Sequence, residues 1–144
     1  MDYRHTQIGI VIIVAQAFVL LHLAYTVMRG KAIPVVVWIV SLILVSFFSL
    51  TVEIKDDLLR VWFGPGFIRR QILLKEIVAA RIVRNPWYSG WGIRWMPTKY
   101  WLWNVSGFDA VELELKNGKR FRIGTDEPDL LVQAIQNTNA IQVS

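Results

Sequence analysis

The side chains that enzymes use for covalent, acid–base and metal chemistry are scarce in this sequence. It contains no cysteine and two histidines, His5 and His22, one before and one inside a long apolar run. Without cysteine there is no thiolate nucleophile, disulfide framework or cysteine-based metal site. We find no paired carboxylates or Ser-His-Asp set, and Gly90-Trp91-Gly92 is too short for a phosphate-binding loop. The sequence therefore predicts no enzyme activity, no cofactor and no metal site.

Tryptophan and basic residues together form the clearest candidate for a binding function. Five of the seven tryptophans fall between positions 87 and 103. The indole ring favours the headgroup layer of a membrane, and basic side chains are attracted to anionic lipid. The sequence predicts a lipid- or partner-binding surface made of Trp87, Trp91, Arg94, Trp95 and Lys99. The alternative is that the tryptophan rings fill a core, which we expect more strongly of the two tryptophans at positions 101 and 103.

Charge is distributed unevenly along the chain, whose formal net charge is +5. Residues 60–99 include eight basic residues and one acid, whereas residues 109–129 include six acids and four bases. Surfaces of opposite sign favour head-to-tail association, so we expect Arg69 and Arg70 to contribute to a homo-oligomer. An ordinary solvated surface is the alternative. Basic residues beside aromatic ones also suit single-stranded nucleic acid, but a membrane anchor disfavours that partner.

Two long apolar runs near the N-terminus predict how these residues are positioned. Residues 8–28 and 33–52 carry no formal charge. As helices, both are long enough to cross the ~30 Å hydrocarbon core of a bilayer. The short connection contains Gly30, so the sequence predicts a tight transmembrane hairpin over residues 1–52. A cleaved signal peptide fits less well, because the first run is too long and a second span follows at once.

Basic residues beside the two runs predict the orientation of the hairpin. The connection between the runs holds Arg29 and Lys31. More basic residues lie beyond the other ends of the runs: Arg4, Lys55, Arg60, Arg69 and Arg70. The positive-inside rule then places both termini in the cytoplasm.

Two polar side chains interrupt the first apolar run. An ionisable group inside a bilayer is costly enough to require a partner. We expect His22 to make an intramembrane polar contact, with Gln16, Ser46 or Ser49 across the hairpin or with another subunit. A proton relay is disfavoured, because the spans contain few other ionisable groups.

From residue 53 onward the pattern changes to short segments that alternate apolar and polar residues. Residues 53–144 predict a small domain of six or seven antiparallel strands and one C-terminal helix. The helix is expected to begin after Asp126 as its cap, with Pro128 in its first turn. Its expected inner face consists of Leu130, Leu131, Ala134 and Ile135.

The clearest β-hairpin joins residues 111–115 to residues 119–123. A two-residue turn would place a charge and a core residue on one face. A three-residue loop instead pairs Leu113 with Phe121 and makes Gly118 the left-handed residue of a G1 bulge. We therefore predict the three-residue loop.

Segments 63–70, 89–94, 111–118 and 123–128 resemble the bacterial PH-like domain family, in which a membrane hairpin often precedes a small PH-type domain. The resemblance covers residues 52–136. It implies an α+β or all-β fold: a bent antiparallel barrel closed by a C-terminal helix. It also implies a cytoplasmic location, no enzyme activity and a tendency to self-associate. It does not imply phosphoinositide binding, which belongs to some eukaryotic relatives.

These observations predict a non-enzymatic scaffold or adaptor in the bacterial inner membrane, with a PH-like domain that binds protein partners and anionic lipid. The alternative is an accessory subunit of a larger membrane complex, such as a transport or assembly factor, in which the two helices pack against other chains. A membrane enzyme ranks third, because it would need a clustered polar site.

Overall fold

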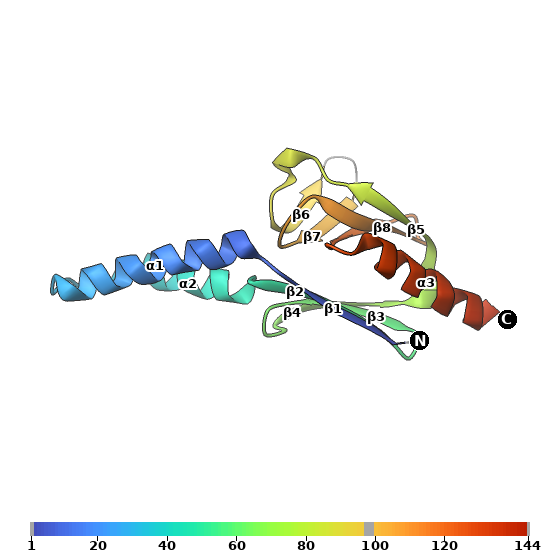
Figure 1. Ribbon diagram of the computed structural model, residues 1–144, viewed down its shortest axis with the longest axis horizontal. Coiled ribbons are helices and arrows are strands. Elements are labelled where there is room, and N and C mark those ends of the chain that lie inside the picture. The colour runs from blue at the N-terminus through green and yellow to red at the C-terminus, as the bar shows by residue number, and fades with distance from the viewer. Residues whose placement is uncertain (1, 97–99, 144) are drawn as a thin grey trace.

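The computed structural model describes residues 2–96 and 100–143 (Figure 1). Two helices extend away from a domain that consists of two β-sheets and a further helix. The elements, in chain order, are β1 (Tyr3–Ile8), α1 (Ile10–Met28), α2 (Val35–Ser46), β2 (Ser49–Lys55), β3 (Leu58–Phe63), β4 (Ile68–Leu73), η1 (Leu74–Glu76), β5 (Ile77–Arg84), η2 (Trp87–Ser89), β6 (Gly92–Met96), β7 (Tyr100–Asn104), β8 (Asp109–Leu115), β9 (Arg120–Gly124) and α3 (Pro128–Val143).

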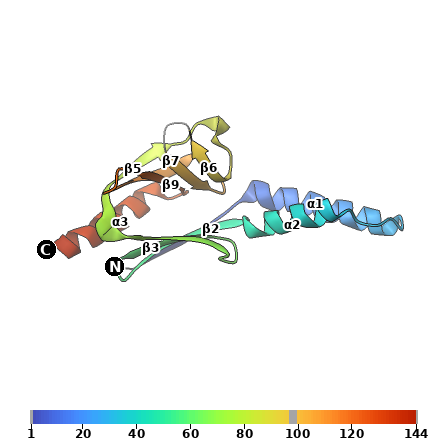
Figure 2. The same ribbon diagram turned by 180° about the vertical axis from the view of Figure 1, so that it is seen from behind.

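The strands form two separate sheets. Sheet A has the order β1-β2-β3-β4 and is antiparallel throughout. Sheet B has the order β5-β8-β9-β7-β6, in which β7 and β9 are parallel. Figures 1 and 2 show the sheets as two layers, with α3 beside the opening between them. The predicted bent barrel of six or seven antiparallel strands, closed by a C-terminal helix, is not confirmed: the described residues form nine strands in two sheets that do not close into a barrel. η1 links β4 to β5 without pairing them, and buried residues of α3 complete the core there.

One hydrophobic core lies between the sheets. Along β3, Leu59, Val61 and Phe63 are fully buried, and the residues between them are partly exposed. This alternation is what a strand with one face on a core requires. From α3, Leu131 and Ile135 reach the same core, whereas Leu130, predicted for the inner face, is half-exposed.

The predicted β-hairpin is confirmed as β8 and β9. Leu113 pairs with Phe121, and both are fully buried. Gly118 has a φ of 82°, and its N–H donates to the carbonyl oxygen of Leu115 at 2.9 Å. Only glycine adopts this backbone conformation without strain, which is why the three-residue loop ends on it.

The second apolar run forms a helix and a strand instead of one long helix. α2 ends at Ser46, and residues 49–52, predicted to lie in the second span, form the first half of β2. These four residues are buried between the neighbouring strands and the core. The prediction included them in the span because they carry no formal charge, although their alternation of polar and apolar side chains is typical of a strand.

β1 has no counterpart in the sequence prediction. It pairs with β2 from Tyr3 opposite Ile54 to Ile8 opposite Ser49. The N-terminal residues therefore belong to sheet A, and the predicted domain boundary at residue 52 falls inside β2. A fragment that begins at residue 53 would lack β1 and the first half of β2.

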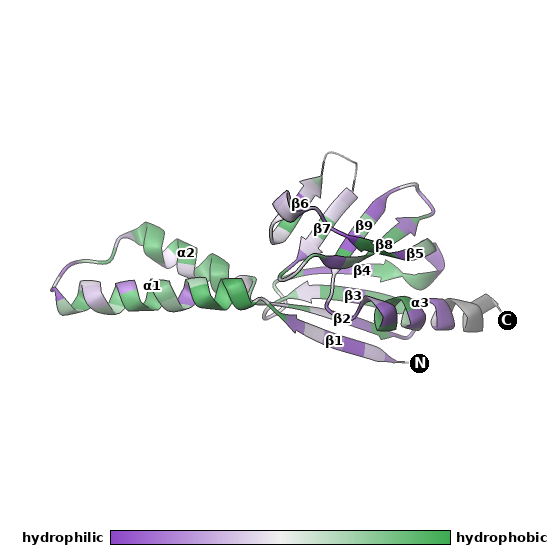
Figure 3. Ribbon diagram, turned by 45° about the horizontal axis from the view of Figure 1, so that its top comes forward, coloured by the Kyte–Doolittle hydropathy of each residue, from purple (hydrophilic) through white to green (hydrophobic). Residues whose placement is uncertain are grey.

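Figure 3 shows that α1 and α2 are the most uniformly hydrophobic part of the molecule. Among the helices of the described residues, α1 alone is long and apolar enough to cross a membrane, and α2 is a shorter apolar helix of 12 residues. The two helices contact each other, and the Gly9 N–H donates to the Phe48 carbonyl oxygen at 2.8 Å where they meet the domain. One membrane-length helix and a two-sheet domain are thus established.

Candidate functional site

Exposed aromatic side chains gather on the side of the domain from which the helices extend. Trp91 lines a hollow of about 270 Å³ together with Ile12 of α1 and Phe47 at the end of α2. In the same β5–β6 connection, Trp87 is 82% exposed and Tyr88 is also exposed, with their rings in edge-to-face contact. Figures 1 and 2 place this connection toward the helical side of sheet B.

The β3–β4 turn contributes a further aromatic residue to this side. The Gly64 N–H donates to the Ser49 carbonyl oxygen at 2.8 Å, and a Cβ on Gly64 would lie 2.8 Å from the Ser46 carbonyl oxygen. This close approach fixes the turn against the end of α2. Phe67, at the end of the turn, is 81% exposed. We call Phe67, Trp87, Tyr88 and Trp91 the basal surface.

The structure brings together only part of the predicted binding set. Trp87 and Trp91 belong to the basal surface, whereas Trp95 lies farther along β6 and contacts the Trp101 ring at 5.1 Å. The Arg94 guanidinium lies against Gly90, so it folds back over the β5–β6 connection. Lys99 lies outside the described residues.

Of the two tryptophans expected in the core, Trp101 and Trp103, only Trp103 is buried there. Trp103 is 7% exposed and contacts Phe63 and Phe121, with ring centroids 5.1 and 5.6 Å apart. Trp101 is 41% exposed, and its ring packs against Trp95 of the edge strand β6.

Arg69 and Arg70 project to opposite faces of β4, as neighbours on a strand must. Arg69 is exposed and forms no ion pair or hydrogen bond among the described residues. The Arg70 guanidinium lies 4.5 Å from the centroid of the Phe121 ring, and burial lowers the pKa of this group. Both side chains are thus cationic groups without an acidic partner in the described chain.

Acids that were expected to attract a second copy are largely paired within their own chain. The buried Glu112 accepts from Arg122 Nε at 2.7 Å, and Glu114 lies 3.0 Å from Arg81 Nη2. The remaining pairs are Asp109 with Arg84, and Asp126 and Glu127 with His5. Head-to-tail association by opposite charge stays a prediction, but these pairings leave it little unpaired acidic surface.

The predicted intramembrane polar contact takes a different form from the one expected. Gln16 Nε2 donates to Ser41 Oγ at 2.8 Å across the two helices. Gln16 Oε1 is buried and has no hydrogen-bond partner. The His22 side chain is exposed beside Phe18 and Val40 and does not contact Gln16. The side chains around His22 are apolar, so within the described residues its imidazole ring has no polar partner.

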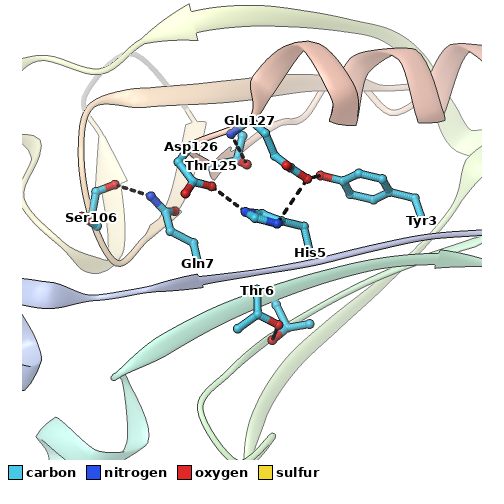
Figure 4. A network of polar contacts seen from close by, with 9 residues as sticks. Tyr3, His5, Thr6, Gln7, Ser106, Thr125, Asp126 and Glu127 are labelled. Atoms are coloured by element: carbon cyan, nitrogen blue, oxygen red, sulfur yellow. Dashed lines mark hydrogen bonds and ion pairs between the residues drawn. The ribbon is translucent and has the colours of Figure 1, made fainter.

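A polar cluster that the sequence analysis missed joins β1 to the start of α3 (Figure 4). The Tyr3 hydroxyl donates to Glu127 Oε1 at 2.6 Å. His5 lies between two carboxylates, with Nε2 at 2.5 Å from Asp126 and Nδ1 at 3.2 Å from Glu127. Gln7 Nε2 donates to the Ser106 carbonyl oxygen. Asp126, predicted as the helix cap, is therefore engaged with β1. Residues 3–7 are polar without alternation and lay outside the predicted domain, so no sequence pattern indicated these contacts.

Tyr3 makes the stability of this cluster dependent on alkaline pH. Burial and the hydrogen bond to Glu127 raise the pKa of the phenol above its usual value near 10. Above pH ~10 the unfolded chain loses this proton first, so the free energy of unfolding falls by up to ~1.4 kcal/mol per pH unit. We expect Tyr3→Phe to remove this slope. Urea unfolding of both proteins between pH 9 and 11 measures it, and a constant difference between them would contradict the assignment.

No group of histidine, aspartate and glutamate side chains suited to hold a metal ion is found in the described residues. The chain matches no protein-family model, and comparisons with curated proteins and solved structures gave no match. The resemblance to the bacterial PH-like family therefore stays a prediction, and function has to be inferred from the geometry of this chain.

Proposed function

We propose that this protein is a non-enzymatic scaffold of the bacterial inner membrane. In this proposal α1, α2 and their connection form a two-span hairpin, and the two-sheet domain lies on the cytoplasmic face. The observation that carries it is the direct continuity of the apolar helices with paired strands: β1 leads into α1, and α2 leads into β2. Because β1 and β2 pair, both ends of the hairpin must lie on the same side of a bilayer.

The lengths of the helices bear on how the hairpin would cross. α1 has 19 residues, or ~28 Å of helix, whereas the 12 residues of α2 reach ~18 Å. Non-helical backbone exposed to hydrocarbon leaves polar groups unpaired. The connection, residues 29–34, therefore belongs at headgroup depth, with the bilayer thinned around it. Its two basic side chains, Arg29 and Lys31, suit that position.

The connections between the helices and the domain are very short, which restricts how the domain can be oriented relative to the membrane. Gly9 is the only residue between β1 and α1, and two residues separate α2 from β2. The domain is thus held in one orientation, with the basal surface toward the headgroup layer, where tryptophan and tyrosine are favoured. The outer faces of sheets A and B remain available to protein partners in the cytoplasm.

Cysteine labelling tests the anchor and its orientation, because the chain has no native cysteine. Lys31→Cys lies in the helix connection and Lys116→Cys in the β8–β9 loop, and both positions are exposed. We expect an impermeant maleimide to label Lys31→Cys in intact spheroplasts and to label Lys116→Cys only after permeabilisation. The opposite pattern would reverse the orientation. Labelling of both sites in intact spheroplasts, or release of the protein by alkaline carbonate, would overturn the proposal.

A second candidate function, an accessory subunit of a larger membrane complex, is favoured by one observation. Gln16 Oε1 is buried without a partner, and the ionisable His22 faces outward among apolar side chains. Polar groups inside a bilayer favour interhelical hydrogen bonds. In this alternative a helix of another chain supplies the donors and acceptors that the hairpin lacks.

A further inference from the structure

A basic pocket lies on the β3–β4 hairpin of sheet A, away from the tryptophan-rich segment. Its volume is about 480 Å³. Pro65 and Gly66 of the β3–β4 turn form one end of it. The residues that line the rest are Glu53, Arg60, Trp62, Arg69, Arg70 and Gln71. Arg60, Trp62 and Arg69 lie on the same face of sheet A, whereas the Arg70 side chain projects to the opposite face, toward Phe121. Two guanidinium groups and one indole ring therefore face the pocket.

The single acid in the pocket is already engaged. Glu53 Oε1 lies 3.2 Å from Arg60 Nη1, and Glu53 Oε2 lies 3.7 Å from Arg4 Nη1. Arg69 has no acidic partner in the described residues, and Arg60 Nε is buried without a hydrogen-bond partner. The pocket thus has an excess of positive charge and unused N–H donors. Guanidinium groups in this arrangement recognise phosphate through paired, charge-assisted hydrogen bonds.

The position of the pocket indicates where its anion comes from. The turn at its end is held against the last turn of α2 by Gly64, as the contact with Ser46 shows. Phe67, in the same turn, is 81% exposed and belongs to the basal surface. An apolar ring beside the end of a membrane helix suits the interface. The pocket therefore opens beside the depth at which lipid phosphates lie.

We propose that this pocket binds the phosphate of an anionic phospholipid headgroup. The inference rests on the membrane anchoring proposed above and deepens it by naming a lipid class and a site. Arg69 contacts the phosphate, with the unpartnered Arg60 Nε as a second donor, and Trp62 packs against the remainder of the headgroup. The bound lipid would fix sheet A to the bilayer at the end of β4, opposite the edge at which β1 lies.

The pocket can be tested on the full chain in dodecyl maltoside micelles by native mass spectrometry and isothermal titration. The probes are short-chain phosphatidylglycerol, short-chain phosphatidylcholine and inorganic phosphate. We expect phosphatidylglycerol to bind the wild-type protein at least tenfold more tightly than phosphatidylcholine. Arg69→Gln should weaken phosphatidylglycerol binding about fivefold, the effect of one charge. Lys116→Gln removes the same charge from the distant β8–β9 loop and should change binding less than twofold.

The arms of this experiment separate the explanations. Equal binding of the two lipids, or equal loss in both variants, would overturn the pocket. Inorganic phosphate that binds as tightly as phosphatidylglycerol would overturn the lipid as the source of the phosphate. Because the Arg69 side chain is exposed, Arg69→Gln should leave the melting temperature unchanged, which separates loss of binding from misfolding. Alkaline carbonate extraction of the variants tests the anchor separately, since failure of the pocket leaves both variants in the membrane.

Discussion

Glu112→Ala should lower the free energy of unfolding of the domain by about 3–5 kcal/mol. The Glu112 side chain is 4% exposed, and its carboxylate holds Arg122 Nε at 2.7 Å, with Arg81 and Arg120 at 3.7 and 4.0 Å. Removing the acid leaves the Arg122 guanidinium, 16% exposed, without its counter-charge inside sheet B. Urea unfolding of the full chain in micelles, followed by circular dichroism, measures the loss.

Glu114→Ala is the matched control for this change. Glu114 lies two residues further along β8, is 37% exposed and pairs with Arg81 alone. An exposed pair of this kind contributes at most ~1 kcal/mol. Glu112→Ala/Arg122→Ala should recover part of the stability lost in the single variant, because no buried charge is then left alone. If Glu112→Ala costs no more than Glu114→Ala, the carboxylate does not hold the strands of sheet B together.

Trp103→Ala should also cost about 3–5 kcal/mol, whereas Trp87→Ala should change stability by less than ~0.5 kcal/mol. Both variants remove one indole ring. The Trp103 ring fills the core between Phe63 and Phe121, so its removal leaves a cavity that the two sheets cannot close. Trp87 projects from η2 with most of its surface in solvent. The same unfolding measurement compares them, and a large loss in Trp87→Ala would show that the basal surface is part of the core.

Local patterns in the sequence were sufficient to predict several elements. The register of β8 and β9 follows from which face carries apolar residues, since a one-residue slip would bury Glu114 in place of Leu113. Asp56 and Asp57 form the turn between β2 and β3, and both have positive φ, a conformation that aspartate adopts more readily than most residues. The start of α3 at Pro128 follows from the fixed φ of proline.

Contacts between distant segments were not predicted. β1 is too polar to show the apolar alternation of a strand, and pairing with β2 across two helices determines its structure. Residues 49–52 were assigned to a span because they carry no formal charge, although their alternation of polar and apolar side chains is typical of a strand. The barrel was not confirmed because the pattern of strands does not reveal which strands pair at the edges of a sheet.

The candidate site was predicted only in part for a related reason. Clustering in the sequence identified Trp87 and Trp91, but it also included Trp95, which lies along β6 beside Trp101. Arg69 and Arg70 were expected to bind a second copy of the chain. Their pocket depends on Glu53 and Arg60, which lie on two other strands, and on Gly64 holding the turn against α2. No local sequence pattern contains that arrangement.

The insertion of both helices between the paired strands β1 and β2 has a consequence for how the protein is made. β1 is synthesised first, yet its partner follows only after α1 and α2 have been translated. In the proposed topology β1 stays unpaired in the cytosol while the hairpin inserts into the membrane. Sheet A is completed only when α2 has returned to the starting side. If α2 does not return to the starting side, β1 stays unpaired, and Tyr3 and His5 lack their carboxylate partners. Folding of sheet A therefore depends on complete insertion of the hairpin.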